Sequence, residues 1–168
     1  MSNVLTTRFW ITLGGCYLAT AVVVCAQTRK AGLWETTSTQ TWQQSPMPGG
    51  AAPPGSGAPN TTKFCLTQQM IDRYNAIVPQ IRGCQLTNVV RKANGMTADM
   101  TCTGTMNGKG NLESFASDSE HAKGKIHFIG SMKMGPNTAA VEWTAESSSV
   151  FKGADCGDVK PAPMPDSK

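Results

Sequence analysis

Cysteine is the residue type whose number and spacing say most about chemistry in this sequence. The 168 residues contain six cysteines, and two of them, Cys16 and Cys25, lie in an apolar N-terminal stretch. The other four are spread over the remaining chain as Cys65, Cys84, Cys102 and Cys156. Zinc sites usually need close pairs such as Cys-x-x-Cys, and no two of these four are that close. An even number in an exported chain instead predicts two disulfides.

Four cysteines can pair in three ways, and the sequence leaves the choice open. We favour Cys65–Cys84, which would close the segment between them onto the strands at either side, together with Cys102–Cys156. The competing pair is Cys84–Cys102. An Asn-Gly turn between these two cysteines would bring their strands together, and one register would place both cysteines on the same face.

Histidine and methionine are the other side chains that could carry chemistry. His121 and His127 match no recognisable metal-ligand spacing, so we interpret them as solvent-facing strand residues. Methionine is more ambiguous, because thioethers can bind Cu(I). Five methionines fall on the expected inner face of neighbouring strands: Met96, Met100, Met106, Met132 and Met134. They alternate with Ile, Phe and Trp, so we favour core packing over copper binding.

Common catalytic motifs are missing from the sequence. It has no Gly-x-Ser-x-Gly elbow and no P-loop pattern. Glu142 and Glu146 are expected on an exposed face opposite lysines, where a ladder of ion pairs explains them. The net charge of +4 is mild and no basic run accompanies it, which argues against a nucleic-acid partner. We therefore assign no catalytic residue, no cofactor and no metal ligand.

The first 26 residues have the features of a secretory signal peptide. Residues 1–8 carry one cation and no acid, residues 9–25 are apolar, and a small-residue cleavage site ends at Ala26. We expect cleavage there, a periplasmic location and no membrane span in the mature protein. The alternatives are a retained anchor, for which the apolar run is short, and a lipoprotein acylated at Cys16, beyond which the apolar residues continue.

The mature chain is long enough for one domain with its own core. We expect a single β-rich domain over residues 27–158. Residues 45–60 are rich in Pro and Gly and predict a flexible loop. Residues 159–168 predict a disordered tail.

One helix is expected, between Cys65 and Cys84. Its apolar stripe has helical spacing and consists of Met70, Ile71, Tyr74, Ile77, Val78 and Ile81. Thr67 is placed to cap its first turn. Pro79 and Gly83 are expected to end or kink it, because proline cannot donate the helical hydrogen bond.

Strands account for the rest of the domain. The expected strands cover residues 32–44, 61–66, 86–92, 96–106, 112–120, 123–134 and a stretch after residue 138. Turns are expected at residues 94–95, 107–110 and 135–138. A shared apolar face would place Met134 opposite Ala139 and His127 opposite Glu146. The expected fold is α+β, a curled antiparallel sheet of six to seven strands packed on one helix and stapled by two disulfides.

Several short motifs resemble a known family. They are Gly32-Leu33-Trp34-Glu35, Phe64-Cys65-Leu66-Thr67, Cys84, Thr101-Cys102 and Gly153-Ala154-Asp155-Cys156. Together they resemble small exported bacterial proteins of the domain-of-unknown-function family three-six-one-seven, over about residues 30 to 156. The resemblance implies an envelope protein but no established activity, so it supplies no catalytic residue. The Pro/Gly insertion at residues 45–60 departs from the family pattern.

Export, a β-rich scaffold with a concave face and the missing motifs favour a non-enzymatic binding or interaction protein of the cell envelope. Its partner would be a small apolar ligand or another envelope protein. Two alternatives stay open: a small envelope enzyme whose site has no local motif, and a copper-binding protein that uses methionines. A cavity in the fold would favour ligand binding, whereas a solid core would remove its basis.

Overall fold

The computed structural model describes residues 29–79 and 81–161. The expected signal peptide at residues 1–26 lies outside these residues, as does most of the expected tail. The first tail residues are described: Pro161 forms a bridge with Cys65 at the end of the second strand. The predicted flexibility of residues 45–60 stays a prediction. In the structure they contain the short 3₁₀ helix η1 (Pro48–Gly50), and Gly57 N donates to Gln40 O.

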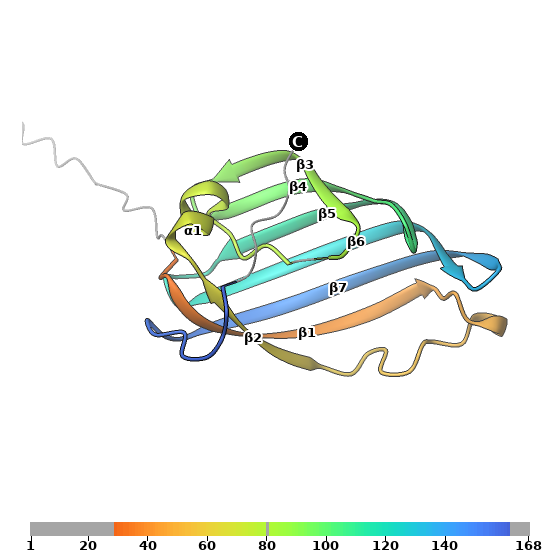
Figure 1. The fold of residues 1–168 in the computed structure, drawn as a ribbon, viewed down its shortest axis with the longest axis horizontal. Coiled ribbons are helices and arrows are strands. Elements are labelled where there is room, and N and C mark those ends of the chain that lie inside the picture. The colour runs from red at the N-terminus through yellow and green to blue at the C-terminus, as the bar shows by residue number, and fades with distance from the viewer. Residues whose placement is uncertain (1–28, 80, 162–168) are drawn as a thin grey trace, which may run out of the picture.

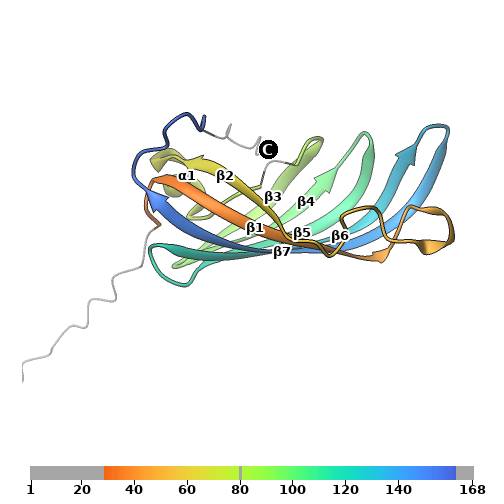
Figure 2. The ribbon, with the colours of Figure 1, turned by 90° about the horizontal axis from the view of Figure 1, so that it is seen from below.

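Seven antiparallel strands form one sheet in the order β2-β1-β7-β6-β5-β4-β3 (Figure 1). They are β1 (Gly32–Gln44), β2 (Asn60–Leu66), β3 (Cys84–Lys92), β4 (Gly95–Cys102), β5 (Met106–Ala116), β6 (His121–Met134) and β7 (Asn137–Gly153). The predicted strand number and antiparallel pairing are confirmed. The sheet is bent (Figure 2) but not strongly curled, which corrects the predicted curl. It stays open because β2 and β3 lie at its two edges.

The helix is shorter than predicted. It spans only α1 (Gln68–Tyr74), and Thr67 caps it as expected by accepting a hydrogen bond from Met70 N. Asn75 ends the helix in the left-handed conformation, with φ 49°, well before Pro79. Its amide Nδ2 donates to the main-chain oxygens of Lys92 and Ala93, so contacts with β3 and its turn hold this helix end.

Two buried clusters divide the core. One lies at the α1 end of the sheet and contains Trp34, Leu66, Met70, Ile71 and Ala122. The other joins the middle strands to the connection between α1 and β3, which runs along the sheet (Figure 1). In this second cluster Tyr74, Ala76 and Val78 pack with Met96, Met100, Phe128 and Trp143. Four residues of the predicted stripe are therefore buried, and Ile77 and Ile81 are partly buried. Only its first three residues lie in the helix, and the others lie in an irregular segment.

Residues 107–110 do not form the predicted turn. They belong to β5, and the turn lies between Cys102 and Met106. Glycine is needed here for packing, because Gly108 pairs with Gly130 on β6 and the Phe128 ring lies over both. A Cβ atom on Gly108 or Gly130 would lie 2.8 or 2.9 Å from Phe128 Cζ. The glycines therefore make room for an aromatic ring within the sheet.

The β6–β7 hairpin is tighter than predicted. Met134 pairs with Asn137, so Gly135 and Pro136 alone form the turn. Lys125 consequently faces Glu146, and His127 faces Thr144. The predicted register is wrong by two residues, but a shift of two keeps every side chain on its predicted face. Charged side chains do pair across these strands, but His127 pairs with Glu142 at 3.0 Å and not with the predicted Glu146, which pairs with Lys125 at 3.1 Å.

The favoured disulfide pairing is wrong. The disulfides are Cys65–Cys156 and Cys84–Cys102. The β3–β4 hairpin places Cys84 directly opposite Cys102, with 3.9 Å between their Cα atoms. On the other side of the molecule, Leu33 of β1 pairs with both Cys65 and Gly153. The chain that leaves β7 therefore passes close to the end of β2, where Cys156 reaches Cys65.

Candidate functional site

A cavity of about 490 Å³ lies over the inner face of the sheet, which is the face that carries Trp143 and Met132. Strands β1, β7, β6 and β5 form its floor, and Ile77, Pro79 and Ile81 from the connection after α1 contribute to its wall. Ligand sites in proteins typically have volumes of roughly 300–1,000 Å³. The cavity is therefore large enough for a small organic molecule, and the concave-face prediction has a physical counterpart.

Inner-face residues of neighbouring strands line up in rows across the floor of the cavity. Near α1 the rows contain hydroxyl groups, and we call this part of the cavity the hydroxyl end. Its residues are Thr36, Ser38, Thr62, Ser114, Ser147 and Ser149. Further along the strands the rows are apolar, and we call this part of the cavity the apolar end. Its residues are Trp42, Met106, Ile126, Met132 and Trp143. The cavity is thus polar at one end and apolar at the other.

Small side chains open the hydroxyl end. Gly124 lines the cavity, and a Cβ atom there would lie 2.7 Å from Ser147 Oγ. Thr36 Oγ1 and Ser149 Oγ are 2.7 Å apart across β1 and β7, so these two hydroxyls share a hydrogen bond. Ser147 Oγ donates to Gly124 O at 3.4 Å. The hydroxyl end is therefore a structured polar surface.

Two buried polar side chains lie beside this end. Arg29 is 3% exposed and Asn75 is 4% exposed. Arg29 Nη1 donates to the main-chain oxygen of Asn75, and Nη2 donates to Ser114 Oγ at 3.4 Å. Burial lowers the pKa of the Arg29 guanidinium to about 10, so it is still a cation at neutral pH. Sequence reasoning missed Arg29, because it follows closely after the apolar N-terminal stretch and belongs to no motif.

The apolar end also contains an unsatisfied donor. Trp143 Nε1 is buried and has no hydrogen-bond partner among the described residues. Its ring stacks on Phe128 with 5.5 Å between the ring centroids. Buried indole N–H groups usually have a hydrogen-bond partner. The Trp143 N–H is therefore an unused donor within an apolar stack of two rings.

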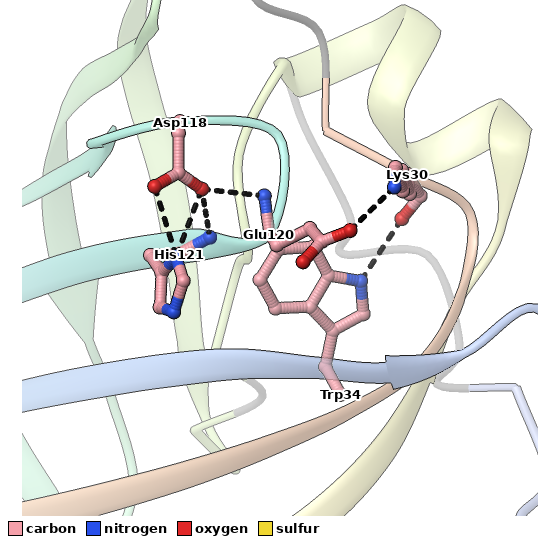
Figure 3. A network of polar contacts seen from close by, with 5 residues as sticks. All are labelled: Lys30, Trp34, Asp118, Glu120 and His121. Atoms are coloured by element: carbon pink, nitrogen blue, oxygen red, sulfur yellow. Dashed lines mark hydrogen bonds and ion pairs between the residues drawn. The ribbon is translucent and has the colours of Figure 1, made fainter.

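The histidines do not belong to the cavity. His121 Nδ1 lies 2.9 Å from Asp118, which also accepts from Glu120 N and His121 N (Figure 3). Hydrogen bonds from Glu120 N and the His121 ring lower the pKa of the Asp118 carboxyl. This exposed pair closes the β5–β6 turn, and His127 pairs with Glu142. Among the described residues that line the cavity there is no histidine and no carboxylate.

The five candidate methionines fall into three environments. Met96 and Met100 are buried in the core, Met106 and Met132 pack beside it and line the cavity, and Met134 is 39% exposed. They do not gather as one ligand set. Within residues 29–79 and 81–161, no three His, Cys, Asp or Glu side chains are grouped to hold a metal ion. The placement of Met96 and Met100 agrees with core packing.

Three of the motifs that carry the family resemblance meet at the α1 end of the sheet, whereas Cys84 and Thr101-Cys102 lie at the opposite end of β3 and β4. Trp34 pairs with Phe64 of β2 and stacks edge-to-face on Phe151 of β7. Its Nε1 donates to Lys30 O at 2.9 Å, and the Lys30 ammonium pairs with Glu120 (Figure 3).

Gly32 and Glu35 also have structural roles at the α1 end. A Cβ atom on Gly32 would lie 2.2 Å from Gly153 O, so only glycine fits. Glu35 pairs with Lys152 at 2.9 Å, and this hydrogen bond lowers the pKa of the Glu35 carboxyl.

The fold and site define a class: a small disulfide-bonded antiparallel sheet with one short helix and an amphipathic cavity. Comparison with family models then identifies the family. Residues 29–156 match the family described as a protein of unknown function, DUF3617, and the chain belongs to it. No curated protein and no solved structure matches the chain. The family assignment thus confirms the resemblance without adding an activity.

Two further observations bear on location. Both described disulfides are of the kind that persists in oxidising compartments, which suggests an extracellular or periplasmic protein. Among the described helices, none has the length and apolar character needed to cross a membrane.

Proposed function

We propose that this protein is a non-enzymatic periplasmic protein of the cell envelope that binds a small, largely apolar molecule. The observation that carries the proposal is the cavity of about 490 Å³ over the inner face. Its apolar end offers two tryptophans, two methionines and Ile126, which would exclude water from an apolar group. The two disulfides support an exported location.

Binding of a neutral apolar probe tests this proposal. N-phenyl-1-naphthylamine fluoresces strongly in apolar surroundings, and we expect it to bind the oxidised protein with one saturable site. Ala145→Trp should reduce its affinity at least about tenfold, because Ala145 lines the cavity and a large ring there would fill it.

Ala140→Trp is the matched control. It lies on the same strand, is exposed and is not part of the cavity lining. This control variant should bind the probe as the wild type does. No saturable binding, or equal loss of affinity in both variants, would contradict the proposal.

A further inference from the structure

The cavity has a buried cation, Arg29, beside its hydroxyl end, and this cation has no carboxylate partner within residues 29–79 and 81–161. The described ion pairs use Lys30, Lys125, Lys152 and the two histidines, and Arg29 forms none of them. Its Nε is buried without a hydrogen-bond partner. Arginine at 3% exposure is normally paired, because removing a charge from water is costly. The described part of the fold therefore contains a cation whose charge no described carboxylate balances.

Ser114 connects this cation to the cavity. Its hydroxyl accepts from Arg29 Nη2, and the same residue lines the cavity. A serine hydroxyl that accepts one hydrogen bond still has its own proton to donate. A ligand oxygen at the hydroxyl end can therefore accept from Ser114 while it feels the charge of Arg29 behind it. The distance from Arg29 Nη2 to Ser114 Oγ is 3.4 Å, which is long for a hydrogen bond. This donor of the guanidinium is therefore only weakly hydrogen-bonded.

Other cations do not offer the same placement. Lys123 and Lys125 also border the cavity, on either side of Gly124, but the Lys125 ammonium pairs with Glu146 and both side chains alternate to the outer face of β6. Arg82 is exposed. Arg29 is thus the cation that adjoins the hydroxyl end from the inner side, and the apolar end begins with Ile126, in the next inner-face row after Ser114 and Gly124.

Resting on the proposed function, we infer that the cavity takes a single-chain amphipathic carboxylate, with its head at the Arg29–Ser114 pair and its chain at the apolar end. A carboxylate balances the buried charge, and hydrogen bonds to charged groups are the stronger ones. A hydrocarbon chain suits Trp42, Met132 and Trp143. The polarity of the cavity fixes the direction in which the molecule lies.

Displacement of N-phenyl-1-naphthylamine from the oxidised mature protein tests the inference. The competitors are dodecanoate and dodecan-1-ol, both below their aggregation limits, so that they differ in the head group alone. We expect dodecanoate to compete about tenfold better than dodecan-1-ol, the size of one hydrogen bond to a charged group. Arg29→Gln, which can still donate to Asn75 O, should remove this preference and leave binding of the alcohol within about twofold.

Arg82→Gln makes the same change of charge at an exposed site and should keep the preference. Ser114→Ala retains Arg29, should weaken dodecanoate selectively, and serves as the test if Arg29→Gln does not fold. Equal affinity of the two competitors in the wild type would overturn the inference while leaving the proposed function intact. If the probe itself does not bind, the proposed function fails and the inference fails with it.

Discussion

Replacing Cys65 and Cys156 together by alanine is expected to lower the free energy of unfolding by about 4.5 kcal/mol in the chain-entropy account of disulfides. The two cysteines are 91 positions apart, so their bond removes a large part of the freedom of the unfolded chain. The bond also joins the end of β2 to the segment that follows β7. Urea unfolding followed by tryptophan fluorescence measures the loss.

The second disulfide is the matched control for this prediction. Cys84 and Cys102 are 18 positions apart, and their replacement by alanine should cost about 3 kcal/mol, because the loop that they close is shorter. The hairpin between β3 and β4 also holds these two positions together without the bond. A greater loss from the Cys84/Cys102 variant than from the Cys65/Cys156 variant would contradict the account.

Trp34→Ala should have an effect of similar size, about 3–5 kcal/mol. Trp34 is completely buried, packs at the α1 end of the sheet and stacks on Phe151 with 5.6 Å between the ring centroids. Its removal leaves a cavity between α1, β1 and β7 and also loses the hydrogen bond to Lys30 O. Thermal and urea unfolding of the oxidised protein should both report the change.

Trp34→Phe separates the two contributions. It keeps a ring in the core but loses the Nε1 donor, so we expect about 1–2 kcal/mol. A loss below about 1 kcal/mol for Trp34→Ala would show that the α1 end is not a packed part of the core.

The strands could be predicted because their inner and outer residues alternate. β1 begins and ends where the Thr- and Trp-rich stretch does, and the β3–β4 turn lies at Ala93-Asn94, one residue before the predicted Asn94-Gly95. The cross-strand register was harder, because parity fixes the face but not the pairing. A two-residue error between Met134 and its partner therefore left every side chain on the correct face.

The end of the helix and the turn at residues 107–110 were predicted wrongly for the same reason: tertiary contacts override local sequence signals. Asn75 ends α1 early because its side chain is held by the main chain of β3 and its turn. Gly108 and Gly110 look like turn residues, but they lie in β5 because the Phe128 ring and the Met100 side chain need the space above them. Neither contact can be read from neighbouring residues in the chain.

The candidate site was only partly predictable. The apolar inner face follows from alternation, and Met106, Met132 and Trp143 were assigned to it correctly. The hydroxyl end was not foreseen, because its serines and threonines come from four different strands and meet only through the sheet order. Arg29 was missed because no local pattern distinguishes a buried arginine from an exposed one.

Methyl NMR of the oxidised protein labelled with ¹³C at its methionine methyl groups tests the central claim most directly. Met106 and Met132 line the cavity, whereas Met134, on the same strand as Met132, is exposed. On addition of N-phenyl-1-naphthylamine, whose rings shift nearby methyl signals, we expect the signals of Met106 and Met132 to move with one saturation curve while Met134 stays unchanged. Movement of Met134 alone, or of no methionine signal, would contradict the cavity as the binding site.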